Sequence, residues 1–347
     1  MHGASLVGEA IRGSAQVNET FDCRYINLST SESIADIGRM SLRKLRTMAD
    51  LRRRVRRSLS EFRPDWVYMT PAACGLGFKK DYLLARMIKR RGFKVVVHFH
   101  NKGVAAASDP LSRLLYKDFF RDVKVILLSR ALYPDIREYV APEQVFICPN
   151  GIKDTAASIA VHRDNPICHI LYLSHLQVAK GILDLLDACR ILREAGRRFV
   201  LDIAGGPSGE ISRERLSEEI SGRGLTDVCN CLGWVDGPSK EQAFMQADVF
   251  VFPTRYEAFG LVALEAMMYR LPVVATDEGS LREIVTDGES GLIVPRCDAS
   301  ALAEGLGKLL SDAPVRERMG AVGRARFEQL YTEEAFLQRF VDILLQL

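Results

Sequence analysis

The stretch Ala247–Pro295 reads ADVFVFPTRYEAFGLVALEAMMYRLPVVATDEGSLREIVTDGESGLIVP and decides the fold. It contains two short runs rich in β-branched and aromatic residues, Val249–Phe252 and Pro272–Thr276, with a helix-length apolar segment between them. A strand, a helix and a second strand in this order form a βαβ unit, whose two strands are parallel. The stretch therefore predicts an α/β protein.

The same alternation of short apolar runs with helix-length amphipathic stretches extends over the whole chain. The other strand candidates, in chain order, are Arg24–Leu28, Trp66–Thr70, Lys94–Phe99, Val123–Leu128, Val145–Cys148, His169–Leu173, Phe199–Ala204, Val228–Leu232 and Leu292–Val294. This pattern is typical of doubly wound parallel sheets with helices on both faces. Ligands of such sheets usually bind at the carboxyl ends of the strands.

The segment Cys148–Pro166 contains prolines, an Asn-Gly pair and no periodicity, so it marks a boundary between two domains. We expect an N-terminal domain over residues 1–150, a second domain over residues 151–331 and a C-terminal helix over residues 332–347. A doubly wound domain usually opens with a strand. Here a helical pattern starts at Gly3 instead, so we expect the first strand of the N-terminal sheet to be missing.

The composition is that of an ordinary globular protein, because 48% of the 347 residues are hydrophobic and 26% are charged. It excludes a disordered tail protein, a collagen and a disulfide miniprotein. No apolar run approaches the roughly 18 residues of a membrane-spanning helix. The beginning of the chain lacks the basic and apolar regions of a secretory signal. The eight cysteines are scattered, so we expect reduced thiols in a cytoplasmic protein.

The formal net charge of +3 hides an asymmetry between the two halves of the chain. Residues 1–150 carry 26 Lys and Arg against 15 Asp and Glu, a net +11, whereas residues 151–347 carry 21 against 29, a net −8. An anionic partner of the first half would explain this split, and so would a chance imbalance between solvated faces. We recognise no nucleic-acid-binding motif and expect no nucleic-acid partner.

Two carboxylates flank the expected start of a helix in the opening stretch. Glu257 lies in the loop after a strand, the helix is expected to begin near Phe259, and Glu265 lies on its second turn. Free backbone N–H groups at a helix start hold phosphates or sugar oxygens, and Gly260 allows close approach. Carboxylates accept hydrogen bonds from vicinal hydroxyls. The alternative is that Glu257 only complements the helix dipole and that Glu265 is a surface residue.

Glu257 and Glu265, with Phe259-Gly260-Leu261 between them, resemble the E-x7-E signature of retaining glycosyltransferases of family GT4. These enzymes have the GT-B fold of two Rossmann-like domains. Further segments resemble the family in the same order along the chain: His2–Ser5, Pro149–Ile152, Ser174–Gly181, Ile203–Gly206, Leu232–Val235, Pro272–Thr276 and Glu283–Val285. An ordered set of this kind is far more specific than one motif alone.

The resemblance implies a donor site in the second domain and an acceptor site in the first. It implies that Glu257 contacts hydroxyls of the donor sugar and that Glu265 contacts the nucleotide ribose. It also implies that Lys180 neutralises the diphosphate as it leaves. The other residues of the implied donor site are Gly3, His175, Phe259, Gly260 and Leu261.

Other implied features concern the acceptor side. The resemblance places a histidine near the reacting sugar and the acceptor, and His100, at the end of a strand, fits best. His98 is the alternative, and a purely structural histidine is the other interpretation of both. The family's C-terminal helix packs back toward the first domain, which is what we expect of residues 332–347.

The implied function is transfer of a sugar from a nucleoside-diphosphate sugar to a sugar, lipid-linked or small-molecule acceptor, with retention at the anomeric carbon. Polysaccharide or glycolipid synthesis at the cell surface is the expected setting. One departure favours an alternative, a non-catalytic sugar-nucleotide-binding protein: Ser174-His175 stand where the family usually has Gly-Arg. A neutral histidine brings little charge to a diphosphate at pH 7. A phosphorylase or epimerase on the same fold is a third possibility.

The chain contains no Asp-x-Asp, the paired carboxylates that a metal-bridged diphosphate site would need. We therefore infer metal-independent chemistry and no bound cofactor. It also contains no G-x-G-x-x-G after a strand and no G-x-x-x-x-G-K-[ST], which argues against a dinucleotide oxidoreductase and a P-loop enzyme.

Residues Ser41–Phe62 form a basic amphipathic helix in the prediction, because apolar residues recur at three- and four-residue steps. Eight Lys and Arg lie between Arg43 and Arg57, against Asp50 alone. One interpretation is contact with an anionic membrane surface or lipid-phosphate acceptor, which would make the protein peripheral on the inner face of the membrane. The other is an ordinary solvated face.

Overall fold

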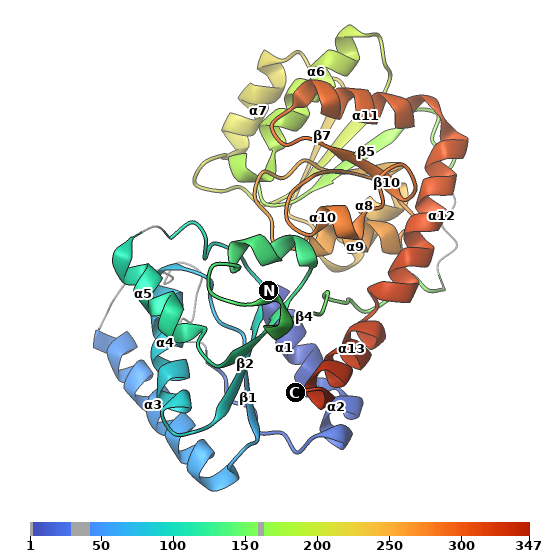
Figure 1. The fold of residues 1–347 in the computed structure, drawn as a ribbon. Coiled ribbons are helices and arrows are strands. Elements are labelled where there is room, and N and C mark those ends of the chain that lie inside the picture. The colour runs from blue at the N-terminus through green and yellow to red at the C-terminus, as the bar shows by residue number, and fades with distance from the viewer. Residues whose placement is uncertain (1–2, 29–41, 108, 159–162) are drawn as a thin grey trace. The chain divides into compact units, whose positions relative to one another are not determined.

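The structure, a computed structural model, describes residues 3–28, 42–107, 109–158 and 163–347. The chain divides into two compact units, Met1–Pro149 with Phe336–Leu347, and Asn150–Ala335. Each unit is built on one parallel sheet with helices on both faces (Figure 1). The predicted α/β class is therefore confirmed.

The first unit contains a four-stranded parallel sheet in the order β1-β2-β3-β4. Its strands are β1 (Trp66–Met69), β2 (Lys94–Phe99), β3 (Val123–Leu127) and β4 (Val145–Ile147). Its helices are α1 (Gly3–Gly13), α2 (Ala15–Thr20), α3 (Leu42–Phe62), α4 (Gly75–Lys89), α5 (Pro110–Phe119) and most of α13 (Glu333–Leu345). Short 3₁₀ helices, η2 (Arg130–Asp135) and η3 (Pro142–Gln144), lie between β3 and β4. Among the described residues, no strand precedes β1.

The predicted strand Arg24–Leu28 is wrong, because this extended segment joins no sheet. Side chains of the neighbouring helices satisfy its carbonyl groups instead. Arg54 donates to the Asn27 carbonyl over 3.0 Å, and Lys80 donates to the Leu28 carbonyl over 3.0 Å. A strand exists only where a neighbouring strand completes its hydrogen bonds.

Helix α13 covers one face of the first unit's sheet. Its Phe336 and Phe340 are buried against Val7 of α1 and Val96 of β2. Thr332 caps this helix, since its hydroxyl accepts from the Ala335 N–H over 3.2 Å. Helices α3, α4 and α5 lie on the opposite side of the sheet (Figure 1).

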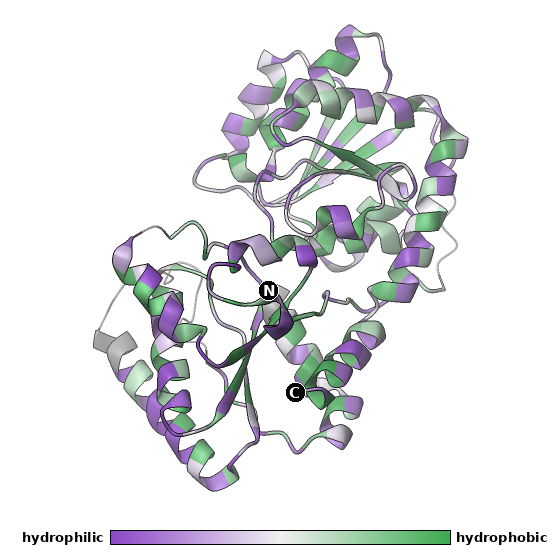
Figure 2. Ribbon diagram, in the orientation of Figure 1, coloured by the Kyte–Doolittle hydropathy of each residue, from purple (hydrophilic) through white to green (hydrophobic). Residues whose placement is uncertain are grey.

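The second unit contains a six-stranded parallel sheet in the order β10-β9-β8-β5-β6-β7. The strands are β5 (His169–Leu173), β6 (Val200–Ala204), β7 (Cys229–Gly233), β8 (Val249–Phe252), β9 (Val273–Thr276) and β10 (Gly291–Val294). The helices are η4 (Val178–Lys180), α6 (Ile182–Glu194), α7 (Arg213–Gly222), α8 (Gly237–Gln246), α9 (Leu261–Met268), α10 (Leu281–Ile284), α11 (Ala299–Ser311) and α12 (Ala313–Leu330). Every residue of β8 and β9 is buried, and the sheet is mostly green in Figure 2, as expected of parallel strands buried on both faces.

The strand order of this second sheet reverses at β5. The chain adds β6 and β7 on one side of β5 and then β8, β9 and β10 on the other. Loops that follow β5 and β8 therefore leave the sheet in opposite directions and form a crevice at the carboxyl ends of the strands. This reversal is the place where a ligand site is expected.

Candidate active site

The loops after β5 and β8 are joined by backbone contacts at the reversal point. The Arg255 N–H donates to the Ala179 carbonyl over 2.8 Å, and the Thr254 hydroxyl donates to the same carbonyl over 3.2 Å. Gly181 has a left-handed backbone (φ +74°), and a Cβ there would overlap the Pro253 carbonyl. Only glycine fits this close approach.

Lys180 and Glu257 form an ion pair between these two loops. The Lys180 Nζ lies 2.8 Å from the Glu257 Oε2, and both side chains are 21% exposed. The Lys180 Nζ also donates to the Tyr256 carbonyl over 3.3 Å, and the Glu257 Oε1 accepts from the Ala258 N–H over 2.9 Å. An ammonium and a carboxylate thus stand side by side in reach of a polar ligand.

Helix α9 begins beside this pair, at Leu261 rather than near Phe259 as predicted. Gly260 is the N-cap with a left-handed backbone (φ +97°), which ends the preceding loop, and the Phe259 side chain is buried. A Cβ on Gly260 would lie 2.8 Å from the Leu281 side chain. The first N–H groups of a helix lack acceptors within it, so this start can hold an anion.

Glu265 is paired with a residue that the sequence did not indicate. The Glu265 Oε1 lies 2.6 Å from the Nζ of Lys240 on α8, and both side chains are about three-quarters buried. Lys240 lies 25 residues away in the sequence, so only the packing of α8 beside α9 creates this pair. A hydroxyl-bearing ligand at Glu265 would share the carboxylate with Lys240.

His175 follows β5 and is exposed beside an aromatic side chain. Its ring centroid lies 5.6 Å from that of Trp234, which follows β7 and is 61% exposed. Trp234 lies in the segment Leu232–Val235, which resembles the family, but the sequence analysis predicted no role for it. Both rings stand at the carboxyl ends of the strands.

Gly3 and His100 belong to the first unit, whereas the other predicted site residues belong to the second. Gly3 is the first residue of α1, and His2, the other end of the resemblance here, lies outside the described residues. His100 directly follows β2, and its ring centroid lies 4.1 Å from that of His98.

His98 is fully buried, and the Tyr68 hydroxyl lies 3.0 Å from its Nδ1. Burial lowers the pKa of His98 well below its ordinary value, and the neighbouring His100 lowers it further. His98 is therefore neutral and part of the core, which favours the structural interpretation for this residue.

Two further residues lie against the site without a sequence signal for it. Glu278, the second residue after β9, accepts from the Glu257 N–H over 3.2 Å, and Arg296 lies 2.6 Å from its other oxygen. Charged residues are common in loops after apolar strands, so the sequence did not single out either residue.

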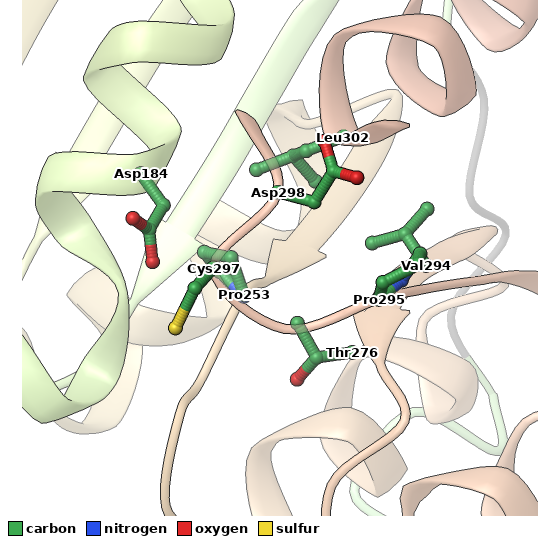
Figure 3. Close-up of a pocket in the computed structure, with 8 residues that line it drawn as sticks. All are labelled: Asp184, Pro253, Thr276, Val294, Pro295, Cys297, Asp298 and Leu302. Carbon is green, nitrogen blue, oxygen red and sulfur yellow. The ribbon is translucent and has the colours of Figure 1, made fainter. Parts of the chain in front are cut away.

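A small hollow lies near the carboxyl ends of β8, β9 and β10 (Figure 3). Asp184 on α6 lies on one side of it, and Cys297 and Asp298 lie before and at the start of α11. The hollow leaves no room for even a water-sized sphere, whereas ligand pockets begin at roughly 300 Å³. Asp184 is already engaged by Arg255, whose Nη2 lies 2.5 Å away. The hollow is therefore no site for a sugar nucleotide.

Three other observations hold for the described part of the chain. None of its His, Cys, Asp and Glu residues gather in groups of three or more that could hold a metal ion. All eight cysteines are free thiols. None of the described helices combines the length and apolarity needed to cross a membrane.

Comparison with known proteins identifies the family. The profile of the glycosyl transferases group 1 matches residues 152–326, about half of the chain and nearly all of the second unit. The chain belongs to this family. The expected relationship is thus confirmed, and so is the GT-B fold, because the chain is similar to solved glycosyltransferases over most of its length.

Individual relatives agree with this assignment. The chain is 33% identical to the alpha-D-kanosaminyltransferase of Streptomyces kanamyceticus over 69% of this chain and 66% of the relative. It is 30% identical to the capsular polysaccharide biosynthesis glycosyltransferase CapM of Staphylococcus aureus over 47% of this chain and 42% of CapM. The Anabaena protein HepE, in a structure with UDP, superposes with a TM-score of 0.72 at 20% identity over 89% of this chain and 85% of HepE. The matches span less than two thirds of the length of the two curated relatives.

Proposed function

We propose that this chain is a retaining glycosyltransferase that transfers a sugar from a nucleoside-diphosphate sugar to an acceptor. The observation that carries the proposal is the Lys180–Glu257 pair, 2.8 Å apart at the strand reversal and beside the start of α9. A cation and a helix N-terminus suit a diphosphate, and a carboxylate suits sugar hydroxyls. The UDP bound by HepE supports this class of donor.

Each residue of the second unit has a distinct role in this proposal. Lys180 and the backbone of Phe259, Gly260 and Leu261 stabilise the charge that develops on the leaving diphosphate. Glu257 accepts hydrogen bonds from the donor sugar in exchange for part of its contact with Lys180.

The nucleotide end of the donor uses other groups. Glu265 accepts hydrogen bonds from the ribose beside Lys240, and His175 donates one hydrogen bond to the diphosphate. The positive charge of Lys180, together with the lack of any Asp-x-Asp, supports a reaction without a metal ion.

The first unit binds the acceptor in this proposal, and His100 and Gly3 are its candidate site residues. The setting is polysaccharide or glycolipid synthesis, which the name of the relative CapM supports. A non-catalytic sugar-nucleotide-binding protein is the second candidate, and the exposed His175 in place of the family's arginine favours it.

The test begins with thermal-shift screening against UDP, GDP, ADP and TDP and their sugar derivatives, because a ligand of the folded state raises the melting temperature. Once the screen has identified the nucleotide and its sugar derivative, Glu265→Ala should weaken binding of the nucleoside diphosphate by roughly tenfold to a hundredfold. This is the expected cost of losing a hydrogen bond to a charged group. Glu257→Ala should weaken only the sugar-bearing donor or its turnover. The matched control is Glu304→Ala, an exposed carboxylate paired with Lys308.

Three results bear on the proposal. If the chain is a retaining transferase, NMR of the product should show the same anomeric configuration as the donor. Binding without turnover would favour the non-catalytic candidate. Equal titrations of wild type, Glu257→Ala and Glu265→Ala would contradict the site assignment.

We also propose that α3 docks on an anionic membrane surface. Its apolar stripe, Leu51, Val55 and Leu59, is buried in the first unit, so the contact would be electrostatic and peripheral. Two of its arginines are partly neutralised: Arg57 lies 2.6 Å from Glu61, and Arg53 lies 3.3 Å from Asp50.

Sedimentation with vesicles containing phosphatidylserine tests this docking. Wild type should bind them, and binding should fall with salt. Changing Arg52, Arg53, Arg56 and Arg57 to Ser should reduce binding. The proposal would be contradicted if the wild type and the variant sedimented equally. It would also be contradicted if the wild type bound neutral phosphatidylcholine vesicles but not those with phosphatidylserine.

A further inference from the structure

The turn after β9 closes on the backbone of the β8–α9 loop, which we define as Pro253–Gly260. Its first contact is made by the buried Glu278 side chain, whose Oε1 accepts from the Glu257 N–H over 3.2 Å. The other oxygen, Oε2, accepts from the Arg296 Nη1 over 2.6 Å. A buried carboxylate is costly unless it is paired and hydrogen-bonded. Here one oxygen meets a cation and the other meets the main chain of a proposed site residue.

The next two residues of the turn hold the same loop. The Ser280 N–H and hydroxyl both donate to the Ala258 carbonyl, over 3.1 Å and 2.7 Å. Gly279 has a left-handed backbone (φ +54°), and a Cβ there would overlap the Glu257 carbonyl. Three consecutive residues thus contact the main chain of Glu257 and Ala258.

We propose that Glu278 is a positioning residue for Glu257. Its carboxylate fixes the Glu257 main chain, so that the Glu257 side chain meets Lys180 on the other side of the loop. This inference rests on the proposed function and deepens it. A misplacement of about 1 Å in a reacting group can cost a hundredfold in rate, so an anchor on the backbone of a site residue acts on turnover.

The carboxylate of Glu278 supports a positioning role, because a side chain that only filled the buried space would not need to be charged. An apolar side chain could fill the same buried space after a buried strand, but it could not accept the Glu257 N–H. Arg296 is half exposed and lies 3.5 Å from Asp277 as well, so it neutralises the turn from the solvent side. The carboxylate is therefore supported in its buried position by a cation that does not itself enter the loop.

The experiment compares Glu278→Ala, which removes the acceptor, with Glu278→Gln, which keeps one oxygen acceptor of the same reach. Glu289→Gln, an exposed acid further along the chain, is the matched control. Circular dichroism melting verifies that each variant folds. The first readout is amide hydrogen exchange of residues 253–260 in the ligand-free protein. The second is turnover of the sugar nucleotide and binding of the nucleoside diphosphate that the screen identifies.

For Glu278→Ala we expect exchange at the Glu257 amide to rise at least about tenfold, because its acceptor is lost. We expect kcat to fall about tenfold or more, with nucleoside-diphosphate affinity within about twofold of wild type. Glu278→Gln should stay within about threefold of wild type in exchange and in kcat, because its oxygen still accepts the N–H.

Two results would overturn the proposal. Glu278→Ala could leave exchange and kcat unchanged, or Glu278→Gln could lose as much as Glu278→Ala, which would assign the effect to the charge on Arg296. Glu265→Ala is measured in parallel. If it leaves nucleoside-diphosphate binding unchanged, the proposed site fails, while the exchange readout, which needs no ligand, still decides whether Glu278 anchors the loop.

Discussion

The two sheets of the molecule place different chemistry at the carboxyl ends of their strands. The six-stranded sheet reverses its order at β5, and Lys180 and Glu257 meet there. The described strands of the four-stranded sheet follow chain order without a reversal, and its β2 ends in the packed pair His98 and His100. Topology rather than overall charge therefore locates the candidate phosphate site, which lies in the acidic half of the chain.

The largest effect expected from this comparison is on Lys180. Lys180→Ala should lower kcat by about 10²–10³-fold, the usual result of removing one preorganised group that stabilises developing charge. Binding of the sugar nucleotide should change less, because the leaving group gains its charge only during the reaction. Steady-state kinetics with the identified donor measure both.

The control for Lys180→Ala is Lys308→Ala. Lys308 is an exposed lysine of the same unit that also pairs with a glutamate, Glu304. The Lys308→Ala substitution should leave kcat unaltered. A Lys180→Ala protein with wild-type turnover would mean that another group neutralises the diphosphate.

The sequence predicted the strands well and the contacts between elements poorly. Ten of the eleven expected strands exist, with ends within one residue, because buried parallel strands are near-continuous apolar runs. The exception, Arg24–Leu28, has the right composition but no neighbouring strand. Local pattern alone does not reveal whether a partner is present.

The same limit applies to the candidate site. Glu257, Gly260 and Glu265 could be found because their spacing within one loop and helix is a local pattern. Lys240 and Glu278 could not, because they reach the site through packing between elements. The start of α9 was misplaced by two residues because Gly260 adopts a left-handed backbone, which sequence only permits.

A second prediction concerns the close approach of the two loops at the reversal. Gly181→Ala should lower the free energy of unfolding by about 3 kcal/mol. The alanine would have to adopt a left-handed backbone, and its Cβ would overlap the Pro253 carbonyl. The matched control from the four-stranded unit is Gly75→Ala. Gly75 has a similar backbone (φ +70°) but open space around its Cβ position, so only about 1–2 kcal/mol of strain is expected.

Urea unfolding of the two glycine variants and of wild type measures this difference. Equal losses would mean that the loops after β5 and β8 can separate without cost. The close packing at the reversal would then not be needed for the stability of the second unit.

A third prediction concerns His98 in the four-stranded unit. Its pKa is lowered well below the ordinary value by burial, so below about pH 6.5 the unfolded chain binds a proton that the folded chain does not. Stability should therefore fall as pH falls from 7 to 5, and His98→Phe should remove part of that slope. Thermal midpoints over this range measure it.

The control for His98→Phe is Val97→Ala, a fully buried neighbour on the same strand. It should lower the midpoint equally at every pH, because neither side chain titrates. If His98→Phe gave a curve parallel to wild type, burial of His98 would not be the source of the acid sensitivity.

The smallest expected effect concerns His175, the departure from the family at the reversal. His175→Arg adds a permanent cation near the proposed diphosphate, and we expect nucleoside-diphosphate affinity to rise by about twofold to fivefold, the usual size of a partly exposed charge interaction. The gain should shrink with added salt, because salt screens exposed charges. His175→Gln is the matched control, since it can donate a hydrogen bond without charge and should give no gain. Isothermal titration at two salt concentrations separates the variants. If His175→Arg binds more weakly than wild type, the position beside Trp234 does not face the diphosphate, and the argument from the missing arginine to a non-catalytic protein loses its basis.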